Sequence, residues 1–457
     1  MEGRSLTEGN ITKNLLRFAL PMMAGNLLQQ FYNVADTLMV GRFLGADALA
    51  AVGSSYTLMT FLTSILLGLS MGSGAFFSIC YGKKDLDQMK TSAFLSFVLI
   101  AAVTLVLNIA VFVGLDPIIQ LLQVPEGIVP LMRDYLWVIF WGISATFLYN
   151  YFAALLRAVG NSVVPLIFLG ISAVLNIILD LIFVLVFSWG VAGAAVATIF
   201  SQFVSGIGIA IYTMLRVPVF RIRRSHLKWD KRILKEITGL SFLTCIQQSI
   251  MNFGILMVQG LVNSFGPAVM AAFAAAVKID SFAYMPVQDF GNAFSTFIAQ
   301  NYGAGKAERI QKGIRSAAGA AMAFCVAVSG IVCIFARQLM QIFVQPGETE
   351  IISIGVQYLW IEGACYCGIG LLFLLYGFYR AVKRPGMSVV LTILSLGTRV
   401  ALAYALSALP SVGVTGIWVS VPIGWFLADL VGILYYKKTR LAYGMAREAE
   451  AADSGRN

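Results

Sequence analysis

Residues 174–186 read Val-Leu-Asn-Ile-Ile-Leu-Asp-Leu-Ile-Phe-Val-Leu-Val. A strand of a membrane barrel alternates apolar and polar residues, whereas this stretch is apolar on both faces and is interrupted only by Asn176 and Asp180. A helix needs about 20 predominantly apolar residues to cross a bilayer, and the apolar run extends over 163–187. The stretch therefore predicts a transmembrane helix that carries two polar side chains.

The rest of the chain has the same character. Of its 457 residues, 59% are hydrophobic and 12% are charged, whereas soluble domains have about 45–50% apolar and roughly 25% charged residues. We therefore predict an all-α integral membrane protein with twelve transmembrane helices. The spans are expected at 15–40, 48–79, 91–114, 131–156, 163–187, 191–214, 237–262, 268–299, 314–336, 351–379, 386–409 and 413–436.

The basic residues are unevenly distributed among the connections between these spans. Of the 32 lysines and arginines, nearly all lie at the N-terminus, in the tail or in every second connection. The exceptions are Arg42, Arg133, Lys278, Arg337 and Arg399. Because cytoplasmic loops carry the excess of basic residues, we expect both termini and the basic central connection in the cytoplasm. A patch for nucleic acid or anionic lipid is the less economical explanation, and no nucleic-acid partner is expected.

The two halves of the chain repeat each other. Tyr135-Leu-Trp recurs as Tyr358-Leu-Trp, and Arg157-Ala-Val recurs as Arg380-Ala-Val, in both cases 223 residues later. Since each half holds an even number of spans, the halves form a parallel repeat, which is typical of transporters with a central cleft. A duplicated scaffold is the alternative, but it has no need of charged residues in the membrane. We predict an N-terminal lobe over 1–214, a connecting loop over 215–236, a C-terminal lobe over 237–440 and a cytoplasmic tail over 441–457.

Several motifs carry a resemblance to one transporter family. They are Leu20-Pro21, Asn33-Val-Ala-Asp-Thr37, Arg157-Ala-Val-Gly-Asn161, Leu175-Asn-Ile-Ile-Leu-Asp180 and Gly190-Val-Ala-Gly. In order and in both halves, the chain closely resembles the multidrug and toxic compound extrusion (MATE) family. The resemblance implies an exporter of small organic, often cationic, compounds that exchanges them for protons or sodium ions. We expect a monomer in the plasma membrane without any other cofactor. The alternative function, found elsewhere in the same superfamily, is to flip a lipid-linked saccharide precursor, and a channel ranks third.

One departure from the family pattern bears on the mechanism. Many members carry a Glu in the seventh span, about ten residues after a Leu-Pro start. Here Ser249 lies near that place, and Ser241 replaces the proline. The chain therefore looks closer to the DinF-like branch, in which coupling depends on the first lobe.

The first lobe contains the residues that could couple transport to an ion. Carboxylates within apolar helices are costly and by default mark a functional site, and Asp36 and Asp180 are two of them. Asn176 and Asp180 are four residues apart, hence on one helical face. The family resemblance adds Gln29, Tyr135 and Thr198 to this set. The coupling ion is expected to be a proton shared by the two carboxyls; sodium at Asp36, Asn176, Asp180 and Thr198 remains open, as does a purely structural role in helix packing.

Pro21 lies about one turn inside the first span. Proline removes a backbone hydrogen bond and permits a bend, and the family resemblance implies that this helix bends there when the carboxylates change protonation state. A simple helix-start proline is the other interpretation.

The second half has its own charged set within apolar spans, which comprises Lys278, Asp280, Asp289, Glu362, Arg399 and Asp429. Lys278 and Asp280 are two residues apart and cannot face each other on a helix. We expect Lys278, Asp280 and Glu362 either to line a cavity or to pack, and Arg399 and Asp429 to form buried ion pairs.

Enzymatic functions find little support in the sequence. The single histidine, His226, lies in the basic central connection, and the chain has no HExxH, P-loop or nucleophile-elbow motif. No break between the spans is long enough for a nucleotide-binding domain. The sequence predicts a gradient-driven transporter and not an enzyme.

Overall fold

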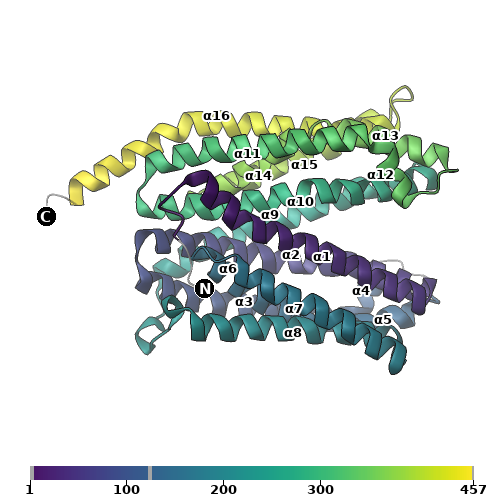
Figure 1. Ribbon diagram of the computed structural model, residues 1–457, viewed down its shortest axis with the longest axis horizontal. Helices are drawn as coiled ribbons and strands as arrows, with labels where there is room; N and C mark the ends of the chain where they lie inside the picture. Colours follow the sequence, from purple (N-terminus) through teal and green to yellow (C-terminus); the bar gives the residue numbers. More distant parts are fainter. Residues whose placement is uncertain (1–4, 122–125, 455–457) are drawn as a thin grey trace. The chain divides into compact units, whose positions relative to one another are not determined.

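The computed structural model describes residues 5–121 and 126–454, and over these ranges the chain folds into helices joined by short connections, without a β-strand (Figure 1). The last three residues of the predicted tail, 455–457, lie outside this description. The first half contains α1 Ile11–Phe43, α2 Ala46–Lys83, α3 Leu86–Val113, α4 Leu115–Leu121, α5 Val129–Ile139, α6 Gly142–Ala158, α7 Val163–Asp180 and α8 Gly190–Arg216. The second half contains α9 Lys231–Asn263, α10 Pro267–Ala304, α11 Ala307–Ile334, α12 Ala336–Phe343, α13 Thr349–Gly363, α14 Tyr366–Ala381, α15 Pro385–Ser407 and α16 Val414–Ser454.

Most of the predicted spans are continuous apolar helices. Within the described ranges, nine helices are long and apolar enough to cross a membrane, and two bent helix pairs bring this number to eleven. The first predicted span is α1, which is also long enough at 33 residues but is less apolar because it carries residues such as Gln29 and Asp36. The helices thus form the predicted twelve-span all-α architecture, and the span that holds Asp36 is among the less apolar of them.

Two of the predicted spans are not single helices. The span at 131–156 consists of α5 and α6, which meet at 42°, and the span at 351–379 consists of α13 and α14, which meet at 50°. The breaks fall just before Gly142 and just after Gly363, at equivalent places in the two halves. Glycine weakens a helix because its backbone has more freedom to lose. The sequence does not show these bends, because apolar composition continues across each break.

The chain forms two compact units that each contain parts of both halves of the sequence. Unit 1 holds Leu20–Ser249 and unit 2 combines Leu6–Ala19 with Ile250–Asn457. The dividing points lie inside α1 and α9, so each of these helices begins in one unit and ends in the other. The predicted boundary between the two lobes, at 214–237, lies in the central connection and not inside these helices. The division into the predicted lobes stays a prediction. What the contacts show is that the first turns of α1 and α9 pack away from the rest of their own half.

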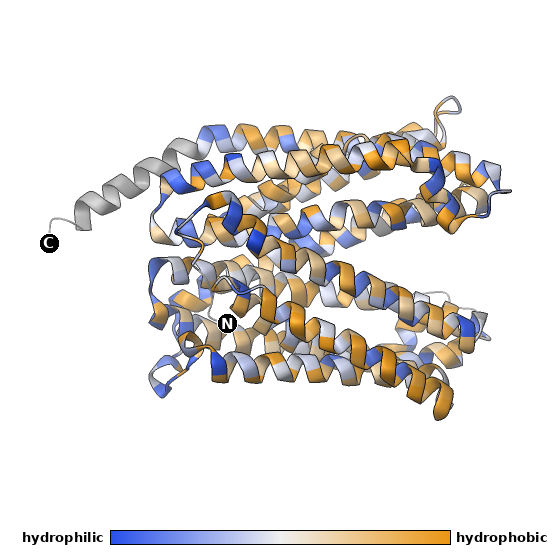
Figure 2. Cartoon of the chain, viewed as in Figure 1, coloured by the Kyte–Doolittle hydropathy of each residue, from blue (hydrophilic) through white to orange (hydrophobic). Residues whose placement is uncertain are grey.

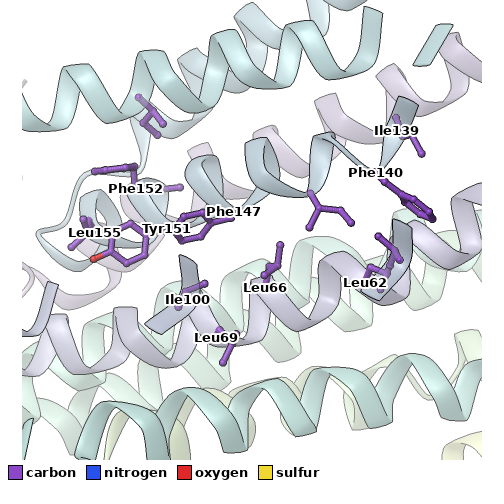
Figure 3. Packing of buried hydrophobic residues seen from close by; sticks show 14 of the residues in the cluster. Leu62, Leu66, Leu69, Ile100, Ile139, Phe140, Phe147, Tyr151, Phe152 and Leu155 are labelled. Carbon is purple, nitrogen blue, oxygen red and sulfur yellow. The ribbon is translucent and has the colours of Figure 1, made fainter. Parts of the chain in front are cut away.

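The core of unit 1 is built by α2, α3, α5 and α6. Leu66 of α2 and Phe140 are fully buried in it, and the Tyr151 ring of α6 lies 5.3 Å, centroid to centroid, from that of Phe97 of α3. Figure 3 shows part of this packing, and Figure 2 shows that hydrophilic residues gather mainly at helix ends and connections. Since lipid is as apolar as these side chains, close packing and not exclusion from water holds such helices together.

Candidate functional site

The last turn of α7 and the return helix α8 position the polar residues of the opening stretch. Asp180 ends α7 and is followed by a π-helix over Leu181–Val186, a local widening that is frequent at functional sites. Ser188 and Gly190 have positive φ angles of 54° and 61°, and they turn the chain into α8. Gly193 of α8 allows the close return, since a Cβ there would lie 3.2 Å from the Phe183 carbonyl oxygen. This turn brings Thr198 beside α7.

Asn176, Asp180 and Thr198 form one hydrogen-bonded group. With its amide oriented to satisfy both ends, Asn176 donates from Nδ2 to Asp180 Oδ2 at 2.9 Å. Its Oδ1 accepts from the backbone N–H of Thr198 at 3.1 Å and from Thr198 Oγ1 at 3.2 Å. Asp180 and Asn176 are each only 1% exposed, so the contact that their spacing predicts is made inside the protein.

Asp36 of α1 joins this group, because its carboxyl lies within hydrogen-bonding reach of that of Asp180. An ionised carboxylate can only accept hydrogen bonds, so a bond between two carboxyls requires a proton on one of them. Oδ1 of Asp36 and Oδ1 of Asp180 are buried and have no hydrogen-bond partner among the described residues. A proton or a cation would satisfy buried acceptors of this kind.

Two tyrosines complete the group. Tyr32 donates from its hydroxyl to Thr198 Oγ1 over 3.5 Å, and Tyr135 of α5 is buried within electrostatic range of both carboxyls. Each residue of this series thus donates a hydrogen bond to the next one, from Tyr32 through Thr198 and Asn176 to Asp180. Tyr32 was missed in the sequence, although it precedes Asp36 by four residues and therefore shares its helical face.

Two first-lobe predictions remain, those for Gln29 and Pro21, and the structure bears on each in a different way. Gln29 is exposed and has no hydrogen bond to the carboxyls in the described part of the chain, so the structure does not bring it into the group. Pro21 lies inside the continuous helix α1 and not at its start. The helix-start interpretation of Pro21 is therefore wrong, and a missing backbone hydrogen bond inside α1 is a fact of the structure.

The second half contains a separate buried polar cluster. Tyr358 of α13 donates to Glu362 Oε2 at 3.0 Å, and Asp280 of α10 and Arg399 of α15 lie within electrostatic range of Glu362. Glu362 is 1% exposed, and its Oε1, like Oδ1 of Asp280, lacks a hydrogen-bond partner among the described residues. Tyr358 corresponds to Tyr135 and Arg399 to Asn176 at the repeat distance of 223. Both halves therefore place polar side chains at the same positions, with different chemistry.

Two expectations for the second half need correction, and a third stays a prediction. Lys278 is exposed and its ammonium lies over the Phe343 ring at 6.0 Å from the centroid, so whether it lines a cavity stays a prediction. Arg399 and Asp429 form no ion pair within the described ranges, and both oxygens of Asp429 are buried without a hydrogen bond. The error has a common cause, since sequence spacing does not show which side chains of other helices face a given residue.

Known proteins share this sequence and fold. The MatE family profile matches residues 21–182 and 241–405, one match in each half of the repeat. The probable multidrug resistance protein YpnP of Bacillus subtilis is 31% identical over 96% of this chain and 98% of its own. The FAD transporter of Shewanella oneidensis is 26% identical over 95% of this chain and 96% of its own. A solved structure of MATE in the bent conformation superposes with a TM-score of 0.91 at 24% identity, over 97% of this chain and 98% of that one.

These matches confirm the twelve-helix fold and the resemblance seen in the motifs. Members of the family are transporters and not enzymes. The conclusion from motifs, fold and profile together is that this chain is a multi-pass membrane transporter of the MATE family.

Proposed function

We propose that this protein exports small organic compounds, often cationic, from the cytoplasm in exchange for protons that enter through the Asp36–Asp180 pair. The observation that carries the proposal is the close approach of these two carboxyls, each of which keeps a buried oxygen without a hydrogen-bond partner among the described residues. Burial of ionisable groups in an apolar helix is costly. A role in binding and releasing protons explains why the two carboxyls are kept there. The relative named as a multidrug resistance protein supports the substrate class.

The donor set favours a proton over sodium as the coupling ion. Two neighbouring carboxyls can share a proton, because an ionised carboxylate only accepts hydrogen bonds, and Oδ1 of Asn176 accepts two hydrogen bonds from Thr198, so that oxygen is engaged. Sodium would need the two orphan carboxylate oxygens together with Asn176 and Thr198 after these bonds rearrange. Sodium at Asp36, Asn176, Asp180 and Thr198 therefore stays the second choice.

We place the transporter in the plasma membrane as a monomer that binds no nucleic acid, with both termini and the connection around Arg221–Lys235 in the cytoplasm. The basic residues support this orientation because they concentrate in that connection and in every second loop. With this orientation, inward proton flow drives substrates outward.

The alternative is transport of an organic anion, for which a flippase of a lipid-linked saccharide precursor is the main case. The relative named FAD transporter favours this alternative, since FAD carries phosphates. An anionic group in an apolar cleft would need several cationic side chains. The apolar spans of the second half offer few, and Arg380 among them already donates to Asn292 at 2.9 Å and to Ser295 at 3.2 Å. This scarcity places the alternative second.

The test is growth of cells that express the protein in the presence of a panel of dyes, cationic antimicrobials and anionic compounds. The matched control is the Asp36→Asn variant, brought to the same amount in the membrane. We expect raised tolerance to several cationic compounds with the unmodified protein and none with the variant. Tolerance unchanged for every cationic compound would refute the export of cations, and a response confined to anionic compounds would establish the alternative.

A further inference from the structure

The segment before α1 is held by side chains of unit 2, to which it belongs. The backbone N–H of Leu6 donates to Oε1 of the buried Gln300 at 2.9 Å, and Nδ2 of the buried Asn301 donates back to the Leu6 carbonyl at 3.3 Å. Lys306 donates from Nζ to the Thr7 carbonyl at 2.8 Å. The Leu6 side chain itself is buried. The segment that precedes α1 is thus bound residue by residue.

Arg309, in the first turn of α11, makes the largest share of these bonds. It donates from Nε and Nη2 to the Leu6 carbonyl at 3.3 and 3.2 Å, from Nη2 to the Glu8 carbonyl at 2.8 Å, and from Nη1 to the Gly9 carbonyl at 2.8 Å. Its guanidinium also lies over the Phe297 ring at 5.6 Å. Together with Lys306, Arg309 therefore binds four successive carbonyls, and the planar fork of arginine suits such a fan of acceptors.

The chain turns directly from this segment into α1. Gly9 has a φ of 74°, a conformation that favours glycine, and Oδ1 of Asn10 then caps the helix by accepting from the Lys13 N–H at 3.0 Å. The Thr12 and Ser316 hydroxyls hydrogen-bond at 2.7 Å, which adds a contact between the first turn of α1 and α11. The start of α1 is thereby fixed to the first turns of α11.

The central connection repeats this arrangement in unit 1. His226 accepts at Nδ1 from the Arg223 N–H at 2.9 Å, so its proton is on Nε2, which contacts Asp87 Oδ1 at 2.9 Å. Asp87 lies in the first turn of α3, the helix that corresponds to α11 in the repeat. The start of α9 then packs against α2, because a Cβ on Gly72 would lie only 2.5 Å from Ser241 Cα. In both units, a segment before a crossing helix is tied to the first turn of an equivalent helix.

The two crossing helices differ at one decisive position. Leu20-Pro21 in α1 corresponds to Leu240-Ser241 in α9. Ser241 hydrogen-bonds with Ser73 of α2 through the two hydroxyls at 2.9 Å, whereas Pro21 removes a backbone bond from α1 directly beside the Ala19–Leu20 division between the units. Along α1, the fixed start is therefore followed by the missing backbone bond at Pro21 and then by Asp36. The other crossing helix, α9, has Ser241 in place of the proline.

We propose that residues Leu6–Asn10, bound by Arg309, Lys306, Gln300 and Asn301, form an anchor that converts bending of α1 at Pro21 into coupled transport, with Arg309 as its main positioning residue. If the start of α1 is fixed, a change of protonation at Asp36 moves the part of the helix beyond Pro21 against that fixed start. If the anchor is lost, the same event lets the start of α1 move instead, and protons pass without substrate. This inference rests on the proposed proton-coupled export.

The experiment compares Arg309→Ala with Lys312→Ala, which removes the same charge from the next turn of α11. Lys312 pairs only with Glu308 among the described residues and its side chain is 63% exposed. Hydrogen–deuterium exchange of residues 5–14 reports the anchor without any transport. Because Arg309 makes four charge-assisted hydrogen bonds to this segment, we expect exchange in it to rise roughly tenfold or more in Arg309→Ala and to stay unchanged in Lys312→Ala. Unchanged exchange in Arg309→Ala would refute the anchor.

The second readout is the number of protons that enter proteoliposomes for each substrate molecule expelled. We expect this ratio to rise at least about fivefold in Arg309→Ala, in line with the loss of roughly 1 kcal/mol or more of anchoring, and to be partly restored in Arg309→Lys. A purely structural role would lower both fluxes together and leave the ratio as in the unmodified protein, which would overturn the proposal. If the unmodified protein itself moves no substrate, the proposed function fails and this coupling role fails with it, while the exchange data still decide whether the anchor exists.

Discussion

The Asp36 carboxyl of α1 lies within hydrogen-bonding reach of the Asp180 carboxyl at the end of α7. This contact links the crossing helix α1 to the α7–α8 pair, where Asn176 and Thr198 already hold Asp180 in place. A proton that enters or leaves this pair therefore changes a contact between helices and not merely the charge of one side chain. In the proposed function, this is the step through which the proton gradient acts on the protein.

The first prediction concerns Asp180. Asp180→Asn keeps the size of the side chain and can still donate a hydrogen bond to Asp36, so Asp36 remains as a titrating group. We expect the initial rate of gradient-driven efflux to fall by about fivefold, which corresponds to about 1 kcal/mol, without being abolished. The measurement is substrate efflux from proteoliposomes. Complete loss would mean that Asp180 itself carries the proton and does not merely support Asp36.

The second prediction concerns the donors that lead to Asp180. Thr198→Val removes the hydroxyl that accepts from Tyr32 and donates to Asn176, so Asn176 loses a partner. Net hydrogen bonds contribute about 0.5–1.5 kcal/mol each, and we expect a loss of about threefold to tenfold in efflux. Tyr32→Phe removes only the hydrogen bond to Thr198, which at 3.5 Å is the longest of the series, and should lower efflux less. Tyr56→Phe is the control, because Tyr56 is exposed and its hydroxyl accepts a hydrogen bond from Asn33 at 3.4 Å and not from the residues that lead to Asp180. Equal losses in all three variants would argue against this order.

The third prediction concerns the packing of α2 against the start of α9. In Gly72→Ala the new Cβ would lie 2.5 Å from Ser241 Cα, so the helices must separate, and overpacking typically costs about 1–3 kcal/mol. Gly53→Ala on the same helix meets no atom within 4 Å and should not destabilise. Thermal unfolding in detergent should show a lower midpoint for Gly72→Ala alone. A midpoint equal to that of Gly53→Ala would show that α9 does not pack there.

The fourth prediction concerns orientation. Ser225 is exposed in the central connection, and all six native cysteines are free, each buried or half-buried. A membrane-impermeant maleimide should therefore label Ser225→Cys in inverted vesicles but not in intact cells, with the unsubstituted protein as background. Labelling in intact cells would reverse the orientation and, with it, the direction of export.

Much of the site was predictable because it depends on spacing within a helix. Asn176 and Asp180 lie on one face by the four-residue rule, and the same rule would have included Tyr32 with Asp36. The contact between Asp36 and Asp180 was suggested by the cost of buried charge, but its geometry depends on the π-helix after Asp180 and the turn at Gly190. These features leave no mark in the apolar composition of the stretch.

The repeat and the twelve spans were also predictable, because length and apolar composition limit what can cross a bilayer. The bends before Gly142 and after Gly363 were not, nor was the division of α1 and α9 between the two units. The sequence alone does not show which helix a lipid-facing or buried residue packs against. For the same reason the sequence paired Arg399 and Asp429 with ionic partners that the described structure does not provide.

The most direct test of the account is substrate efflux from proteoliposomes by the unmodified protein and by Asp36→Asn, under an imposed pH gradient or an imposed sodium gradient. Asp36→Asn keeps the shape of the side chain and removes its titrating group, so the variant should remain folded while transport falls to the level of empty liposomes. The unmodified protein should respond to the pH gradient. Full gradient-driven efflux by Asp36→Asn would contradict the first-lobe coupling site, and efflux driven by sodium at equal pH and zero membrane potential would contradict the choice of the proton.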